Sequence, residues 1–248
     1  MAQSDSIAVA ADQKPGRIGK ALIRLFMKRA AVTGCEALGD RLRLITLEGP
    51  ALQGVEWLPG HKIQIAMGSA FLARTYTPIE WDALIGRTRI LAFAHGTGPG
   101  SDWVRRANIG DECDLFGPRA SLDLRQLEGP IAVFGDETSL GLAHAMARHD
   151  PCRVVSGYFE VCGAAVGAAM GDRLGRLDGS FFETAADQSH VAAMEARLPS
   201  LIAGGSAFVL TGKAGTVQRL RQALKLRGVP AARIKAKAYW APGKVGMD

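Results

Sequence analysis

The pattern of apolar residues changes once along this 248-residue chain, and that change limits the folds it can adopt. Between about residues 31 and 124, short segments that alternate apolar and polar residues are separated by Gly and Pro turns, as at 41–47 and Leu58-Pro59-Gly60. Alternation with a period of two indicates strands with one buried face. A succession of such strands predicts a small antiparallel barrel.

After about residue 126 the pattern becomes one of short apolar strands alternating with helical segments. The predicted strands are 131–134, 153–161, 180–183, 207–210 and 234–240. The predicted helices are one that ends near Arg148 and those at 164–170, 189–198 and 216–227. This alternation predicts a mostly parallel, doubly wound α/β sheet, which binds ligands at the carboxyl ends of its strands.

The same change predicts the domain organisation. We expect a flexible tail at 1–16, a β domain at 17–125 and an α/β domain at 126–248. Residues 17–30 have apolar side chains on one side of a helical wheel and basic ones on the other, so we expect an amphipathic helix at the start of the β domain. Packing against its own domain is favoured over contact with an acidic membrane surface.

Composition excludes several classes of function. The net charge is +6, with basic ends and a mildly acidic middle, and no nucleic-acid-binding motif is present, so we expect no nucleic-acid partner. No apolar run is long enough to span a bilayer, and the first residues lack the features of a secretory signal. The four cysteines form no C-x-x-C pair, which favours free thiols in a reducing cytoplasm and no metal site.

The segment Arg74-Thr75-Tyr76-Thr77-Pro78 is the first candidate for a binding site. On a strand Arg74 and Tyr76 share one face, which places a guanidinium beside an aromatic ring. A guanidinium suits a phosphate, and a phenol ring can lie against a flat heteroaromatic system. Thr77 adds a hydroxyl. These groups suit a flavin nucleotide, and the alternative is an ordinary strand with a surface arginine and a packed tyrosine.

Two loops add further candidates. The glycine-rich loop from His95 to Trp103 follows a strand and leads into a short helix, so its backbone N–H groups could hold a phosphate. The segment Gly135-Asp136-Glu137-Thr138 follows the first strand of the α/β region, where such a fold receives a nucleotide. It is not a G-x-G-x-x-G motif, and a plain capped helix start fits it as well as a nicotinamide site.

In this order, these segments resemble the siderophore-interacting proteins, which are flavin-dependent ferric-siderophore reductases related to ferredoxin-NADP reductases. The resemblance covers about residues 29–244. It is carried by Pro59-Gly60-His61-Lys62, Arg74 to Thr77, the loop from His95 to Trp103, Gly117-Pro118-Arg119, Gly135 to Thr138 and Tyr239-Trp240. It implies a six-stranded antiparallel flavin-binding barrel followed by a doubly wound parallel α/β nucleotide-binding domain.

The resemblance also implies roles for single residues. Arg74, Tyr76 and Thr77 would hold FAD, with Tyr76 and Thr77 at the reactive ring as the catalytic pair. The adenine-diphosphate side would be shaped by His95, Gly98, Pro99 and Trp103. The incoming nicotinamide would be faced by Gly135, Asp136, Glu137 and Thr138.

The implied activity is the transfer of electrons from NADPH, NADH or a ferredoxin through FAD to a ferric siderophore. Many ferric chelates are anionic, so Lys62 and Lys244 are the candidates for their capture, together with Lys235 and Lys237, for which solvated surface lysines are the favoured alternative. Two alternatives stay open, a general NAD(P)H-flavin reductase and a non-catalytic flavin- or siderophore-binding protein.

Overall fold

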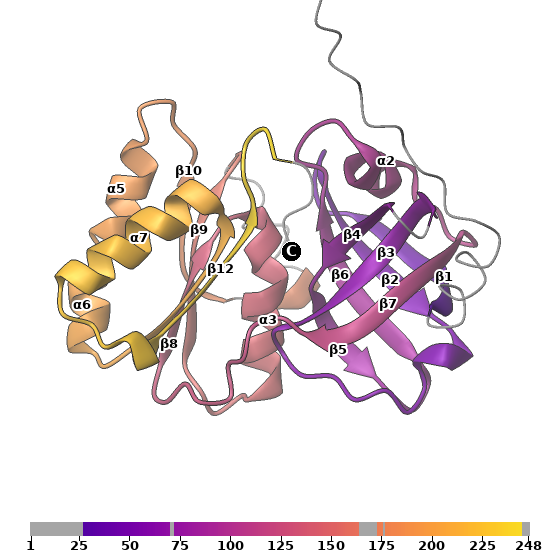
Figure 1. The fold of residues 1–248 in the computed structure, drawn as a ribbon, viewed down its shortest axis with the longest axis horizontal. Helices are drawn as coiled ribbons and strands as arrows, with labels where there is room; N and C mark the ends of the chain where they lie inside the picture. Colours follow the sequence, from indigo (N-terminus) through magenta and orange to yellow (C-terminus); the bar gives the residue numbers. More distant parts are fainter. Residues whose placement is uncertain (1–26, 70–71, 164–172, 176, 245–248) are drawn as a thin grey trace, which may run out of the picture.

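The structure is a computed structural model that describes residues 27–69, 72–163, 173–175 and 177–244. In these ranges the chain forms a seven-stranded antiparallel sheet followed by a five-stranded parallel sheet (Figure 1). The predicted fold class, an antiparallel β region followed by a doubly wound α/β region, is confirmed. The antiparallel sheet has seven strands, one more than expected.

The antiparallel sheet has the strand order β4-β3-β7-β1-β2-β6-β5. Its elements are β1 (Lys28–Ala37), β2 (Leu42–Glu48), η1 (Pro50–Leu52), β3 (His61–Ser69), β4 (Leu72–Tyr76), β5 (Pro78–Asp82), β6 (Arg87–Phe93), α2 (Pro99–Arg106) and β7 (Glu112–Ala120). The edge strands β4 and β5 follow each other in the chain and are separated by Thr77 alone. The sheet therefore bends so that its two edges come together at Thr77.

The parallel sheet has the strand order β10-β9-β8-β11-β12. Its elements are β8 (Ile131–Gly135), η2 (Glu137–Ser139), α3 (Leu140–His149), β9 (Val155–Val161), β10 (Asp178–Glu183), α5 (Ser189–Glu195), α6 (Leu198–Ala203), β11 (Ala207–Lys213), α7 (Ala214–Leu226), η3 (Ala231–Arg233) and β12 (Ile234–Trp240). The chain leaves the central strand β8 in one direction and returns to its other side at β11. The switch point therefore lies between β8 and β11.

Helix α3 lies between the two sheets (Figure 1). One continuous hydrophobic core joins Leu44, Ile79 and Leu91 of the antiparallel sheet to Val133 and Leu142 of the α/β region. The packing is close, because a Cβ on Gly141 would come within 2.9 Å of the Ile79 side chain. The division at residue 125 stays a prediction, but the core runs across it.

The predicted helix at 17–30 is wrong at its C-terminal end. Lys28–Ala37 is strand β1, which pairs with β2 and β7. Ala30 and Val32 are buried at a spacing of two, while Arg29 is exposed and pairs with Asp114. Arg29, which we expected on the polar side of a helix, thus lies on the outer face of a sheet. The rest of that helix, the tail at 1–16 and the predicted helix at 164–170 lie outside the described residues.

Candidate functional site

A cavity of about 270 Å³ lies between the two sheets. The antiparallel sheet lines it with residues of β3, β4 and β6 and with the loop that starts α2, and the parallel sheet lines it with the end of β12 and with Thr138. The predicted site residues that line it are Lys62, Arg74, Tyr76, Thr77, His95, Gly98, Pro99, Thr138 and Lys244. Most of the predicted site therefore comes together in one place.

Tyr76 forms one wall of the cavity and has the rigid surroundings that a stacking platform needs. It lies opposite Ile63 on β3, and its ring packs against Trp103, with 5.5 Å between the ring centroids. Burial raises the pKa of the Tyr76 phenol well above its usual range, and the nearby Arg74 opposes this shift only in part. The phenol is therefore neutral at physiological pH. Trp103 does not line the cavity but supports Tyr76 from behind.

Arg74 extends from the same strand to the start of α2. Its Nη1 donates a hydrogen bond to the Ala73 carbonyl oxygen, at 2.8 Å. Its aliphatic part lies against Gly100, where an added Cβ would come within 2.9 Å of the Arg74 Cγ. A side chain at position 100 would therefore displace the arginine from this place.

The start of α2 is suited to an anion. Gly98 is the N-cap residue with φ +125°, and no side chain caps the helix. Gly100 and Ser101, in the first turn, line the cavity beside Arg74. The uncapped N–H groups and positive end of a helix, next to a guanidinium, form an arrangement that binds phosphate.

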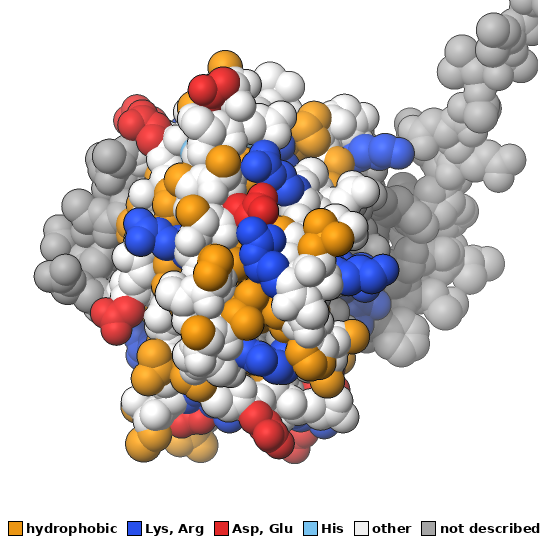
Figure 2. Space-filling model, turned by 90° about the vertical axis from the view of Figure 1, so that its left-hand side faces the viewer, with side chains coloured by type: hydrophobic (Ala, Val, Ile, Leu, Met, Phe, Trp, Pro, Cys, Tyr) orange, Lys and Arg blue, Asp and Glu red, His pale blue; other side chains and the backbone are white. Residues whose placement is uncertain are grey.

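The charged side chains that line the cavity are basic. Lys62, Arg74, Lys237 and Lys244 line it, and none of its described lining residues is acidic. The outer face formed by α5, α6 and α7 differs, because basic and acidic side chains are interspersed there (Figure 2). The cationic lining is therefore a local property of the cavity, and it favours an anionic ligand.

His95 and Trp240 meet across the cavity from the two sheets. Their rings are stacked, with 5.5 Å between centroids and 12° between planes. Burial lowers the pKa of His95, although Asp136 opposes that shift, so the imidazole is neutral at pH 7. The Trp240 indole Nε1 donates to Asp136 Oδ2 at 2.7 Å, which fixes the ring in its place against His95.

Asp136 is buried, does not line the cavity, and connects three strands through its hydrogen bonds. It is 2% exposed. Its carboxylate accepts hydrogen bonds from the backbone N–H groups of Thr138 (2.9 Å) and Lys213 (2.8 Å), in addition to Trp240 Nε1 and the Thr138 hydroxyl. Burial raises the pKa of Asp136, and these hydrogen bonds oppose the shift. One carboxylate thereby joins the ends of β8, β11 and β12.

Gly135 and Glu137 are also turned away from the cavity. A Cβ on Gly135 would come within 2.2 Å of the Ser139 Oγ, so only glycine fits there. Glu137 is 4% exposed, and its Oε1 accepts a hydrogen bond from the backbone N–H of Cys162. Of the four residues predicted to face the nicotinamide, only Thr138 lines the cavity. Their part in nucleotide binding stays a prediction.

One comparison with known proteins matches a segment of the antiparallel half of the molecule. The family model of the siderophore-interacting FAD-binding domain matches residues 66–122, which contain β4, His95 and α2. The predicted resemblance to siderophore-interacting proteins is confirmed. The matched segment carries Arg74, Tyr76 and the helix start described above.

Three longer matches cover between 68% and 88% of this chain. A curated NADPH-dependent ferric-chelate reductase of Escherichia coli (strain K12) is 27% identical over 170 residues, which are 68% of this chain and 66% of the relative's length. A siderophore-interacting protein from Aeromonas hydrophila has a TM-score of 0.70 at 22% identity, covering 88% of this chain and 93% of that one. The ferredoxin reductase in carbazole 1,9a-dioxygenase has a TM-score of 0.71 at 19% identity, covering 86% and 69%. These two structures show the fold.

The described residues contain neither a membrane-spanning helix nor a cluster of metal-binding side chains. None of their helices has the length and hydrophobicity needed to cross a bilayer. No group of three or more His, Cys, Asp or Glu side chains in these ranges is arranged to hold a metal ion.

Several lining residues were not predicted as site residues. Thr97 and Ser121 line the cavity, and Lys237 donates from Nζ to Ser121 Oγ at 2.9 Å. Tyr239 also lines it, with the Thr77 and Thr211 side chains beside its phenol, whose pKa burial raises to about 12. The signal that could have found Tyr239 is its position near the carboxyl end of the last predicted parallel strand, and Lys237 on the same strand was a candidate for chelate capture.

Proposed function

We propose that this cavity holds FAD and that the protein uses it to reduce a ferric siderophore with electrons from NADPH or NADH. The observation that carries the proposal is the meeting of two features at one cavity. The segment that matches the siderophore-interacting FAD-binding domain lines one side, and the carboxyl end of the parallel strand β12 lines the other. Nucleotides bind at such strand ends.

The residues present fit FAD. The uncapped start of α2 and the Arg74 guanidinium suit its diphosphate. Tyr76, supported by Trp103, offers a neutral aromatic face for the isoalloxazine ring. Thr77, at the junction of the two sheet edges with Tyr239 beside it, can donate a hydrogen bond to the ring. Thr138 and the His95–Trp240 pair define the side from which a nicotinamide would approach.

Bound FAD supplies the conversion between a two-electron hydride donor and an acceptor that takes one electron at a time. The protein positions the ring edge and limits access of water to it. Lys62 and Lys244 lie at the same cavity and would attract an anionic chelate. Reduction of Fe(III) to Fe(II) weakens its bonds to hard oxygen ligands, so the iron is then released. A reduced ferredoxin is the alternative electron donor.

The test uses purified protein loaded with FAD. Under anaerobic conditions, NADPH, NADH or reduced ferredoxin is added first, and the flavin absorbance is followed. A ferric siderophore is then added together with a chelator that gives colour only with Fe(II). We expect colour only when donor, protein and siderophore are all present. Protein that binds no FAD, or holds FAD that no donor reduces, would contradict the proposal.

The outcomes also separate the alternatives. A general flavin reductase would reduce free FAD or FMN at a rate that the siderophore does not change. A non-catalytic binding protein would retain FAD or siderophore without oxidising NADPH. To test the role of the lysines, Lys62→Glu and Lys244→Glu are compared on one anionic and one neutral ferric chelate. We expect a higher KM of about three- to tenfold for the anionic chelate only.

A further inference from the structure

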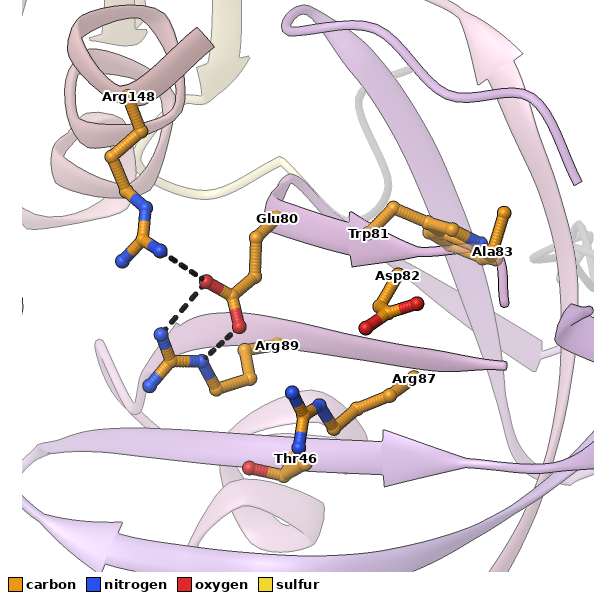
Figure 3. Close-up of a pocket in the computed structure, with 8 residues that line it drawn as sticks. All are labelled: Thr46, Glu80, Trp81, Asp82, Ala83, Arg87, Arg89 and Arg148. Atoms are coloured by element: carbon orange, nitrogen blue, oxygen red, sulfur yellow. Dashed lines mark hydrogen bonds and ion pairs between the residues drawn. The ribbon is translucent and has the colours of Figure 1, made fainter. Parts of the chain in front are cut away.

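A second hollow lies near the opposite end of α3 from the FAD cavity. It is an open groove of about 680 Å³ formed by β2, β5, β6 and the C-terminal end of α3 (Figure 3). The chain segment of η2 and α3 begins beside Thr138, which lines the first cavity, and ends beside Arg148, which lines this one. The two hollows share no lining residue. The groove has the volume of a small-molecule site, for which about 300–1,000 Å³ is typical.

Three arginines converge on this groove, and two of them share one carboxylate. Arg89 binds Glu80 through both oxygens, with Nε–Oε1 at 2.6 Å and Nη2–Oε2 at 2.8 Å. Arg148, from α3, approaches the same Glu80 Oε2 at 3.1 Å. Figure 3 shows both guanidinium groups directed at this single side chain. The single negative charge of Glu80 is thus paired with two guanidinium groups, one on β6 and one on α3.

The side chain of the third arginine, Arg87, makes no ion pair or hydrogen bond with any described residue, and it extends over the groove beside Thr46 (Figure 3). The other acid of the groove, Asp82, is engaged elsewhere. Its Oδ1 accepts hydrogen bonds from the backbone N–H groups of Leu84 (3.0 Å) and Ile85 (3.3 Å) in the turn between β5 and β6. The groove therefore has guanidinium donors that its own carboxylates do not satisfy.

We propose that this groove binds a small polyanion, a molecule that carries at least two phosphate or carboxylate groups. Arg87 would contact the anion directly, and Arg89 and Arg148 would turn their remaining N–H donors toward it. A guanidinium presents several donors in a planar fork that matches the oxygens of either group. Three arginines line the groove with only two carboxylates, and an added anion offsets the excess positive charge.

The test measures anion binding to FAD-loaded protein, so that the other cationic cavity is filled. Pyrophosphate and citrate are titrated separately by calorimetry at low ionic strength. We expect saturable binding of at least one of them, weakened about tenfold or more by Arg87→Ala. The tighter ligand identifies the source as a phosphate ester or a polycarboxylate. Arg87→Lys, which keeps the charge without the fork, should recover only part of the affinity.

Two control variants, each lacking an exposed arginine outside the groove, test whether the binding is specific to the groove. Arg221→Ala removes an exposed arginine from α7, on another face of the molecule, and should leave binding unchanged. Arg106→Ala removes an exposed arginine from the last turn of α2 and should also leave it unchanged. The proposal is overturned if neither anion binds at up to about 1 mM. It is equally overturned if Arg221→Ala or Arg106→Ala weakens binding as much as Arg87→Ala, or if Arg87→Ala leaves binding unchanged.

Discussion

The two sheets contribute to the proposed FAD cavity in different ways. The antiparallel sheet presents side chains to it, among them Arg74, Tyr76 and His95, whose surroundings keep them accessible to a ligand. After β8 of the parallel sheet, by contrast, Asp136 and Glu137 are buried and accept hydrogen bonds from backbone N–H groups. A motif at a strand end can therefore act by direct contact or by fixing the strands that make contact. Mutations should separate these two roles, because only the replacement of a residue that fixes the strands should lower the free energy of unfolding.

The largest effect on stability should come from Asp136→Ala. It leaves the buried N–H groups of Lys213, Thr138 and Trp240 without their acceptor, and unmade buried hydrogen bonds are costly. We expect a loss of roughly 3–5 kcal/mol in the free energy of unfolding, measured by urea denaturation. Asp136→Asn retains one acceptor oxygen and should lose less. A change below about 1 kcal/mol for Asp136→Ala would remove the contrast between the sheets.

The buried helix between the sheets should make stability depend on pH. Burial lowers the pKa of His144 on α3 to about 4 from its usual 6.5, and the nearby Arg148 adds to this shift. Between these values the unfolded chain binds more protons than the folded one, so stability falls as pH is lowered through this window. The loss should reach about 3 kcal/mol near pH 4.

The measurement for His144 is urea denaturation at several pH values, with His144→Gln compared with wild type. The variant should lose this part of the slope, and the contributions of Asp136 and Glu137 cancel in the difference. His149→Gln, at the exposed end of the same helix, is the control and should keep the slope. An unchanged slope in His144→Gln would show that the histidine is protonated in the folded protein.

Two glycine substitutions test the contrast with matched chemistry. Gly135→Ala, in the parallel sheet, places a methyl group within 2.2 Å of the Ser139 Oγ and 2.8 Å of the Thr211 carbonyl oxygen. Gly96→Ala, in the loop of the antiparallel half, meets no atom within 4 Å. We expect a loss of about 1–3 kcal/mol for the first and less than about 0.5 kcal/mol for the second. Thermal unfolding measures both, and equal effects would contradict the assigned packing.

The smallest effect on stability should come from Arg74→Ala, which removes a side chain directed at a ligand. We expect the free energy of unfolding without FAD to change by less than about 0.5 kcal/mol. The affinity for FAD should fall about 10- to 100-fold through loss of a charge-assisted hydrogen bond. Flavin fluorescence titration measures the affinity. An unchanged FAD affinity would place the diphosphate elsewhere.

The features that could be predicted from sequence are local ones. The period of two placed Arg74 and Tyr76 on one face of a strand, and the glycine-rich loop marked the start of α2. The alternation of strands and helices indicated the parallel sheet and its ligand-binding edge. In each case the information lies within a few residues, where backbone geometry determines which side chains share a face.

The features that could not be predicted depend on residues far apart in the chain. Asp136 is bonded to Lys213 and Trp240, which lie 77 and 104 positions away. No local pattern shows that a carboxylate at a helix start will be covered by two later strands. The arginine groove likewise joins Arg87 on β6 to Arg148 at the end of α3 without any motif. The strand at Lys28 was missed because basic and apolar residues at a boundary suit either element.

The close contact at Gly141 has a consequence for how the whole molecule behaves. With no room for a methyl group between α3 and β5, the two halves cannot slide or separate without breaking their common core. We therefore expect one cooperative melting transition rather than two. A fragment cut near residue 125 should expose a broad apolar surface and aggregate, and substrates should enter the proposed FAD cavity without any hinge opening.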